Sequence, residues 1–174
     1  MVVKSADTPS HVTDLAEVFH SLRKHQMRLN PDKCVFGVSG GKFLGFMLSS
    51  RGIEANPDKC QAIINMRSPT NLKEVQKLAS RLTPLSRFLP CMAETSRPIL
   101  SLLKKANRFQ WTDECEISFQ LFKKRLGTPP VLNKPTSGRE LILYLAVSCE
   151  AISAGLIQEQ DGQQQPIYFI SRVL

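Results

Sequence analysis

The spacing of the apolar residues changes along the chain, and this change limits the fold more than any other feature of the sequence. Apolar residues recur at helical spacing over 10–26 and again over 57–106. Short apolar runs separated by turn dipeptides occupy 27–48 and 139–170. Because helical and strand-like patterns each gather in blocks, the sequence predicts the α+β class for this chain of 174 residues.

The second block predicts a small antiparallel hairpin after the first helix. Its short strands are expected at 27–29, 34–38 and 42–48. The pair Gly40-Gly41 is expected to form the tight turn, because glycine accepts the positive φ that such turns need.

The third block predicts three helices. The first covers 57–66 and opens with an Asn-Pro pair, which places proline at the first helical position. The second covers 72–88, begins at the capping residue Asn71 and is expected to bend at Pro84. The third covers 96–106.

The last third of the chain predicts one helix and an incomplete antiparallel sheet. Thr112 caps the helix, with acidic residues in its first turn and basic residues in its last, an order that suits the helix dipole. Strands are expected at 139–147, 152–158 and 166–170, with an Asp-Gly turn at 161. Such a sheet lacks the helices that normally cover it.

The net charge of +8 lies entirely in one segment. Between Lys59 and Arg108 there are ten basic and two acidic residues, whereas the rest of the chain carries thirteen of each. Lys73, Lys77 and Arg81 are spaced by four residues and share one face of the predicted helix. A localised positive field attracts polyanions such as nucleic acids. A lysine-rich solvated surface is the alternative that charge alone leaves open.

Several function classes find no support in the sequence. The longest apolar run, Leu141–Val147, is too short to cross a bilayer, and no signal-peptide pattern opens the chain. The five cysteines form no C-x-x-C pair, which disfavours a structural zinc or a disulfide framework. No carboxylate pair has a spacing that suggests two-metal catalysis. The residues by themselves indicate a binding protein.

A set of strings along the chain resembles a known family. They are MRLNPDKCVF (27–36), KFLGFMLSSRGIEANPDKCQAI (42–63), SPTNLKEVQKLASRLTPLSRFLP (68–90), RPILSLLKK (97–105), FQWTDECEISFQLFKKRLGTPPVL (109–132), LILYLAVSCEAISAGLIQEQ (141–160) and PIYFISRVL (166–174). In this order they resemble the pol polyprotein of gypsy-type long-terminal-repeat retrotransposons of a plant-like lineage. The resemblance is to the reverse transcriptase, from its late palm and thumb to an RNase H-like tether.

The resemblance implies four parts. These are a late palm with the primer-grip hairpin at 1–56, a basic helical thumb at 57–108, a tether helix and linker at 109–138, and a partial RNase H-like domain at 139–174. The implied fold is α+β: a partial palm with a β-hairpin primer grip, a helical thumb, and an incomplete RNase H-like mixed sheet.

The family's roles fall on named residues of the palm. Lys33 matches a lysine near the phosphates of the incoming nucleotide, a proposed auxiliary proton donor, although a plain turn lysine is the alternative. Phe43, Leu44, Gly45 and Phe46 match the primer-grip hairpin, which holds the primer 3′ end.

In the thumb, Lys73, Lys77, Arg81 and Arg87 match helices that follow the duplex backbone. Their contacts are expected to be directed to phosphates and independent of sequence. In the RNase H-like part, Ala146 stands where active members carry an aspartate.

The departures from the family bear on catalysis. Polymerisation in this family needs metal-binding aspartates in a Tyr-x-Asp-Asp turn, and the 174 residues contain no such turn. No catalytic or metal-binding residue is therefore assigned, and no cofactor is expected for this fragment. Mg²⁺ is expected only for the complete parent enzyme.

The leading hypothesis is a fragment of an RNA-directed DNA polymerase that binds an RNA–DNA hybrid or a DNA duplex non-specifically and does not polymerise by itself. The alternatives are a non-catalytic interaction module, with the rest of the polyprotein as its partner, and a gene-model remnant. No membrane partner is expected. The expected location is a cytoplasmic virus-like particle or the nucleus, and not the secretory pathway.

Overall fold

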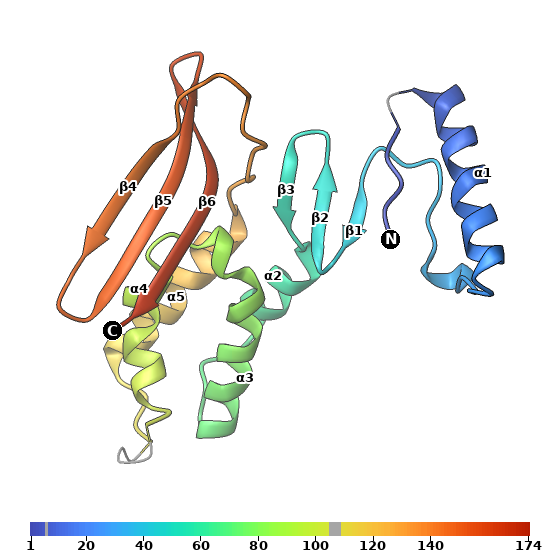
Figure 1. The fold of residues 1–174 in the computed structure, drawn as a ribbon. Helices are drawn as coiled ribbons and strands as arrows, with labels where there is room; N and C mark the ends of the chain where they lie inside the picture. Colours follow the sequence, from blue (N-terminus) through green and yellow to red (C-terminus); the bar gives the residue numbers. More distant parts are fainter. Residues whose placement is uncertain (6, 105–108) are drawn as a thin grey trace. The chain divides into compact units, whose positions relative to one another are not determined.

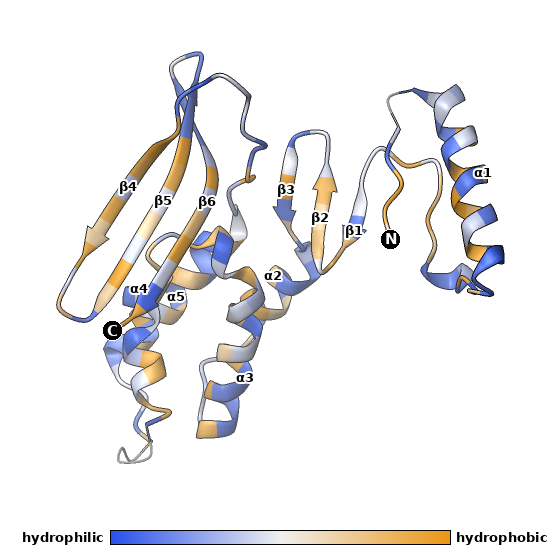
Figure 2. Cartoon of the chain, in the orientation of Figure 1, coloured by the Kyte–Doolittle hydropathy of each residue, from blue (hydrophilic) through white to orange (hydrophobic). Residues whose placement is uncertain are grey.

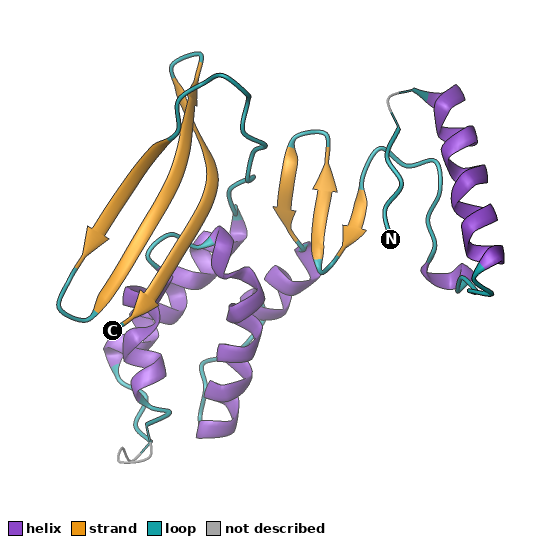
Figure 3. Ribbon diagram, viewed as in Figure 1, coloured by secondary structure: helices purple, strands orange, loops and turns teal. Residues whose placement is uncertain are grey.

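Helices and strands follow one another in blocks, which confirms the predicted α+β class (Figures 1 and 3). The structure is a computed structural model, and it describes residues 1–5, 7–104 and 109–174. The elements are α1 (Thr8–Lys24), the 3₁₀ turn η1 (Pro31–Lys33), β1 (Gly41–Phe43), β2 (Phe46–Ser49), β3 (Gly52–Ala55), α2 (Pro57–Ile64), α3 (Leu72–Leu82), the 3₁₀ segment η2 (Thr83–Phe88), α4 (Met92–Ser101), α5 (Asp113–Gly127), β4 (Ile142–Val147), β5 (Ala151–Gln160) and β6 (Gln163–Val173).

The chain divides into two compact units, Met1–Val38 and Ser39–Leu174. In the first unit, α1 begins at Asp7, whose carboxylate accepts a hydrogen bond of 2.8 Å from the backbone N–H of Ser10. This bond lowers the pKa of Asp7. The cap lies before Thr8, so the helix starts slightly earlier than the sequence predicted.

The strands predicted at 27–29 and 34–38 are wrong. Neither segment forms a strand, and the chain between them makes the 3₁₀ turn η1. Asn30 caps that turn through a hydrogen bond of 3.0 Å from the N–H of Asp32, and Pro31 fixes the φ that a helical turn needs. Asn30 and Pro31 stabilise the turn, but neither flanking segment pairs with a strand in the described part of the chain.

The hairpin also differs from its prediction. The stretch 42–48 is not one strand, because the chain reverses at Leu44 and Gly45, whose φ angles are +48° and +82°. Two positive φ values between paired strands give a type I′ turn. Gly40 instead allows a close backbone approach, since a Cβ placed there would lie 2.3 Å from the carbonyl oxygen of Leu48.

Strands β1, β2 and β3 form an antiparallel sheet, termed the hairpin sheet. Phe43 pairs with Phe46 across the turn, and Phe46 pairs on its other side with Ala55 of β3. Leu132, from the chain after α5, adds a short bridge to the outer side of β3. There Ile53 and Leu132 exchange two backbone hydrogen bonds of 2.9 Å.

The helices of the second unit pack around one apolar core. The largest fully buried side chains come from α2, α3, η2, α4 and α5 and include Ile63, Leu78, Phe88, Ile99 and Phe119. Each such side chain contributes about 1.5–3 kcal/mol by leaving water. The core joins the predicted thumb to the predicted tether helix, so these parts fold together; the four-part division into domains stays a prediction.

Helix α3 turns one apolar face to the core. Val75, Leu78 and Leu82 are buried on that face, whereas Leu72 at the start of the helix is 40% exposed. The helix ends at Leu82, and the chain continues as η2 because Pro84 has no N–H to donate to the preceding turn. At the predicted bend, the chain thus changes from an α-helix to a 3₁₀ segment.

Helix α4 starts earlier than predicted. Its first residue is Met92, which follows Cys91 in a left-handed conformation. Ser96 does not cap the helix; it is buried and its hydroxyl donates to the carbonyl of Ala93. The predicted end of this helix, at 105 and 106, lies outside the described residues.

Strands β4, β5 and β6 form the C-terminal sheet, which is antiparallel throughout the part described, so the predicted mixed sheet is not seen here. The three predicted strands are confirmed, as is the turn at Asp161-Gly162, where both φ angles are positive. Helix α4 lies against β5 and β6 (Figure 1). Ser171 of β6 accepts a hydrogen bond of 2.9 Å from the N–H of Ala93 at the start of α4.

The segment after α5 connects the two sheets. While Leu132 bonds to β3, the N–H of Asn133 donates to the carbonyl of Pro166 in β6 at 2.8 Å. Gly52 makes the first contact possible, since a Cβ there would lie 2.3 Å from the Leu132 carbonyl oxygen. None of the helices in the described part of the chain is long and apolar enough to cross a membrane.

Candidate nucleic-acid interface

Two lysines of α3 form the most open part of the predicted basic row. Lys73 and Lys77 are exposed, and within the described residues neither side chain has an acceptor. The neighbouring Glu74 accepts hydrogen bonds from the N–H (2.7 Å) and hydroxyl (3.0 Å) of Thr70. These bonds, chiefly the backbone one, lower the pKa of Glu74, and Lys77 adds a smaller electrostatic lowering. The two ammonium groups are therefore open to an external anion.

Arg81, the third member of the row, has an internal partner. Its Nη1 donates a hydrogen bond of 2.7 Å to the carbonyl of Ala62 in α2. That carbonyl lies in the last turn of α2, where backbone oxygens lack helical partners. Arg81 thus ties α3 to α2, with only part of its guanidinium left for a ligand.

Arg87 has a third kind of environment. Its guanidinium carbon lies 4.4 Å from the centre of the Phe46 ring and 5.8 Å from that of Tyr168. Phe46 in turn contacts Phe88, with ring centres 6.0 Å apart. The structure therefore brings Arg87 to the predicted primer grip, which the sequence did not predict.

The residues predicted to form a primer grip lie at the turn between β1 and β2, with Phe43 and Phe46 in the strands and Leu44 and Gly45 between them. Leu44 is 78% exposed at its tip. A Cβ placed on Gly45 would lie 2.5 Å from Nζ of Lys59, so the ammonium group of that lysine lies against the turn. The sequence analysis counted Lys59 in the basic segment but did not assign it to the hairpin. Helix α2 starts directly after β3, and this return of the chain brings Lys59 there.

Other cations of the second unit have partners within the protein. Lys123 and Arg125 of α5 donate to the carbonyls of Met66 (2.5 Å) and Pro90 (2.9 Å). Arg97 forms an ion pair with Glu150. Lys123 and Arg125 therefore connect α5 to the segments at Met66 and Pro90. Their positive charges also suit the C-terminal end of α5, where the helix dipole is negative.

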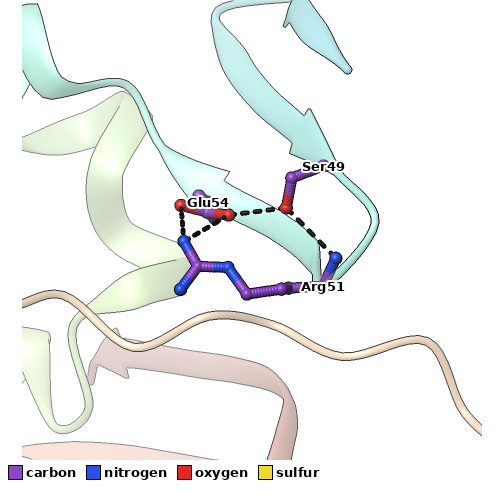
Figure 4. Close-up of polar contacts among 3 residues, drawn as sticks. All are labelled: Ser49, Arg51 and Glu54. Atoms are coloured by element: carbon purple, nitrogen blue, oxygen red, sulfur yellow. Dashed lines mark hydrogen bonds and ion pairs between the residues drawn. The ribbon is translucent and has the colours of Figure 1, made fainter. Parts of the chain in front are cut away.

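A further cation is fixed at the turn between β2 and β3 (Figure 4). Arg51 Nη2 donates to both carboxylate oxygens of Glu54 at 3.0 Å, and the Ser49 hydroxyl donates to the same carboxylate at 2.6 Å. The Ser49 bond is the main reason why the pKa of Glu54 is lowered. Arg51 thus stabilises the hairpin sheet.

Lys33 lies in the first unit, exposed in η1. Its role beside a nucleotide stays a prediction. Ala146 lies in β4 opposite Ser153 of β5. A methyl group supplies no metal ligand, so the residues at this place do not fit a divalent cation. Across the described residues, no three His, Cys, Asp or Glu side chains gather in a way that could hold a metal ion.

The chain is similar to several known proteins. Residues 111–174 match the model of the RNase H-like domain found in reverse transcriptase. The Pol polyprotein from transposon 412 of Drosophila melanogaster is 30% identical over 172 residues, which are 99% of this chain and 14% of that protein. The transposon Tf2-3 polyprotein of Schizosaccharomyces pombe is 27% identical over 94% of this chain and 12% of that protein.

Solved structures of a foamy viral protease-reverse transcriptase share the fold. One, in complex with double-stranded DNA, is 26% identical with a TM-score of 0.79, over 97% of this chain and 30% of that one. Another, in complex with an RNA/DNA hybrid, has a TM-score of 0.81 at 23% identity, over 98% of this chain and 23% of that one.

The chain thus spans about a seventh of the length of the curated relatives it matches. The two relatives come from an insect and a yeast, so the plant-like lineage stays a prediction. Residues 111–174 are thus similar to the RNase H-like domain found in reverse transcriptase, and nearly the whole chain is similar to a short segment of retrotransposon Pol polyproteins.

Proposed function

We propose that this chain is the part of an RNA-directed DNA polymerase that holds the nucleic-acid duplex, and that it binds an RNA–DNA hybrid or a DNA duplex without sequence preference. One observation carries the proposal: Lys73 and Lys77 stand exposed on α3, without an acceptor in the described structure. They lie in the segment that holds the whole net charge of +8.

The chemistry of these groups explains the lack of sequence preference. Lys73 and Lys77 lie about one helical turn apart and carry compact charges on flexible stems. Such groups neutralise phosphates, which every base sequence presents alike. The solved foamy viral structures contain double-stranded DNA or an RNA/DNA hybrid, and this supports a duplex as the ligand here.

The proposal includes no polymerisation by this chain alone. Its 174 residues contain no Tyr-x-Asp-Asp turn. Carboxylates that hold Mg²⁺ for phosphoryl transfer would come from the rest of the polyprotein, which is the proposed protein partner. The proposed location is a cytoplasmic virus-like particle or the nucleus.

The test is the affinity for a DNA duplex as a function of salt. Each phosphate that the protein neutralises contributes about 0.9 to the slope of log K against log[salt] on B-form DNA. The double variant Lys73→Ala/Lys77→Ala should therefore lower the slope by about 1.8. Between 50 and 200 mM salt, that change makes the loss of affinity about twelvefold smaller than in the wild type.

Arg81 stays intact in this variant, because its loss would also break the bond to Ala62. The matched control is Lys124→Ala/Lys134→Ala, which removes the same charge from exposed positions outside the basic segment. An equal change of slope in both variants would show that net charge alone matters, and it would refute the assignment of α3.

A second candidate function is an interaction module, and the C-terminal sheet supports it. Large apolar side chains of β4 and β6 are exposed, including Leu143 (56%), Leu145 (66%) and Ile170 (58%). β4 carries hydrophobic colours along most of its length (Figure 2). Exposed apolar surface of this kind favours association. Light scattering decides between the candidates, since a monomer at all concentrations speaks against the module.

A further inference from the structure

The guanidinium of Arg87 connects two sheets that are distant in sequence. It lies between the ring of Phe46, at the start of β2, and the ring of Tyr168, in β6. A guanidinium near the face of an aromatic ring is attracted by the ring quadrupole, and its planar shape allows contact with a ring on each side. One side chain thus contacts the hairpin sheet and the C-terminal sheet together.

The core lies next to Arg87 and Phe46. Arg87 follows Leu85 and precedes Phe88, both fully buried, so the backbone of η2 is fixed at that point. Phe46 packs on Phe88. Next to Tyr168, Phe169 packs against the same core. Phe46 and the backbone at Arg87 are thus fixed by the core, whereas Tyr168 is 42% exposed and meets Arg87 at the surface.

A second connection closes a ring of contacts. Leu132 bonds to Ile53 of β3, and Asn133 bonds to Pro166 of β6, two residues before Tyr168. The hairpin sheet is thus connected to β6 in two ways, through the backbone at Leu132 and Asn133 and through the side chain of Arg87. Two separate connections restrict the rotation of the hairpin more than either could alone.

The environment of Arg87 differs from that of a surface cation. In the described part of the chain, no carboxylate pairs with it and no acceptor takes a hydrogen bond from it. The contacts that the structure gives its guanidinium are with two aromatic rings. Among the described residues, no aromatic ring lies by the ammonium group of Lys73 or Lys77, and both side chains are exposed.

We propose that Arg87 is a positioning residue, whose guanidinium, clamped between Phe46 and Tyr168, couples the primer-grip turn to the C-terminal sheet so that both are held in register on one duplex. The part that concerns the duplex rests on the proposed function. The clamp itself is a property of the free protein and is tested without a ligand.

The first test is hydrogen exchange of the free protein. Tyr168→Leu removes a ring that lies far from the hairpin in sequence and leaves the charge of Arg87 in place. The amides of Phe43 and Phe46 should exchange about threefold to tenfold faster, which corresponds to the loss of one cation–π contact. Tyr168→Phe keeps the ring and should restore the wild-type rates.

The control is Tyr144→Leu in the same sheet. Tyr144 is 49% exposed and Tyr168 is 42% exposed, and within the described residues Tyr144 has no cation above its ring. This variant should leave hairpin exchange unchanged. Equal hairpin exchange in Tyr168→Leu and Tyr144→Leu overturns the proposal. So does an equal acceleration of the hairpin and of Leu78 in the core, because the effect is then a general loss of stability.

The second test measures duplex affinity against salt for Tyr168→Leu. The proposal predicts affinity reduced several-fold at every salt concentration with an unchanged slope, since no cation is removed. An unchanged affinity overturns the role on the duplex. If the wild type binds no duplex, the proposed function fails, while the exchange test still decides the clamp.

Discussion

Replacement of Leu44 by asparagine should stabilise the protein. Leu44 occupies the first central position of a type I′ turn with φ of +48°, a conformation that costs most L-residues roughly 1–2 kcal/mol. Asparagine tolerates this conformation, and Asn-Gly is the favoured pair for such turns. The wild type has Leu-Gly there.

The structure limits what the replacement loses. The Leu44 side chain is 78% exposed, so only about a fifth of its burial free energy, roughly 0.5 kcal/mol, is given up. The net gain is then about 0.5–1.5 kcal/mol, which for a chain of this size raises Tm by about 1–6 °C. Selection for stability alone would not keep an exposed leucine in a left-handed turn. The presence of Leu44 at the tip of the hairpin therefore supports a role in contact with a ligand.

The assay is urea unfolding followed by the fluorescence of Trp111, whose ring packs edge-on against the buried Phe119. The control is Leu44→Ala, which loses the same side chain but keeps the unfavourable φ. It should be slightly less stable than the wild type. If Leu44→Asn is no more stable than Leu44→Ala, the argument from turn strain is refuted.

Two more predictions concern the hairpin sheet. Gly52→Ala should lower the free energy of unfolding in urea by more than about 2 kcal/mol, because the new Cβ would meet the Leu132 carbonyl oxygen. Gly138→Ala, also at positive φ but in open space, should lower it less. Equal losses of stability in the two variants would contradict this. Glu54→Gln should be less stable than the wild type at neutral pH. Because the folded pKa of Glu54 is lowered, its contribution is present above the ordinary value of 4.5 and is lost as the pH falls through the folded pKa, so the difference should shrink in acid unfolding curves; a constant difference would contradict it.

Local signals in the sequence predicted much of the fold. Where these predictions failed, contacts between residues distant in the sequence decided the structure. The pentapeptide NPDKC occurs at 30–34 and at 56–60, and in both places asparagine caps the following turn. Only the second copy continues as a helix, because Cys60 and Ile63 enter the core. The capping chemistry was readable, but the apolar partner that extends one turn into a helix was not.

The candidate site shows the same division. The sequence predicted the basic segment and the row at Lys73, Lys77 and Arg81, since charge and helical spacing are local properties. It did not predict that Arg81 would bond to Ala62 or that Arg87 would lie between two rings. Those partners come from other elements, and only the folded chain brings them together.

The most direct measurement of the central claim is a lysine-acetylation footprint of the intact chain, with and without a saturating RNA–DNA hybrid. The account predicts that the duplex protects Lys73 and Lys77 on α3, while Lys124 and Lys134 react equally in both samples. If Lys73 and Lys77 react equally with and without the hybrid, or if only Lys124 and Lys134 are protected, the claim that the exposed cations of α3 hold the duplex is contradicted.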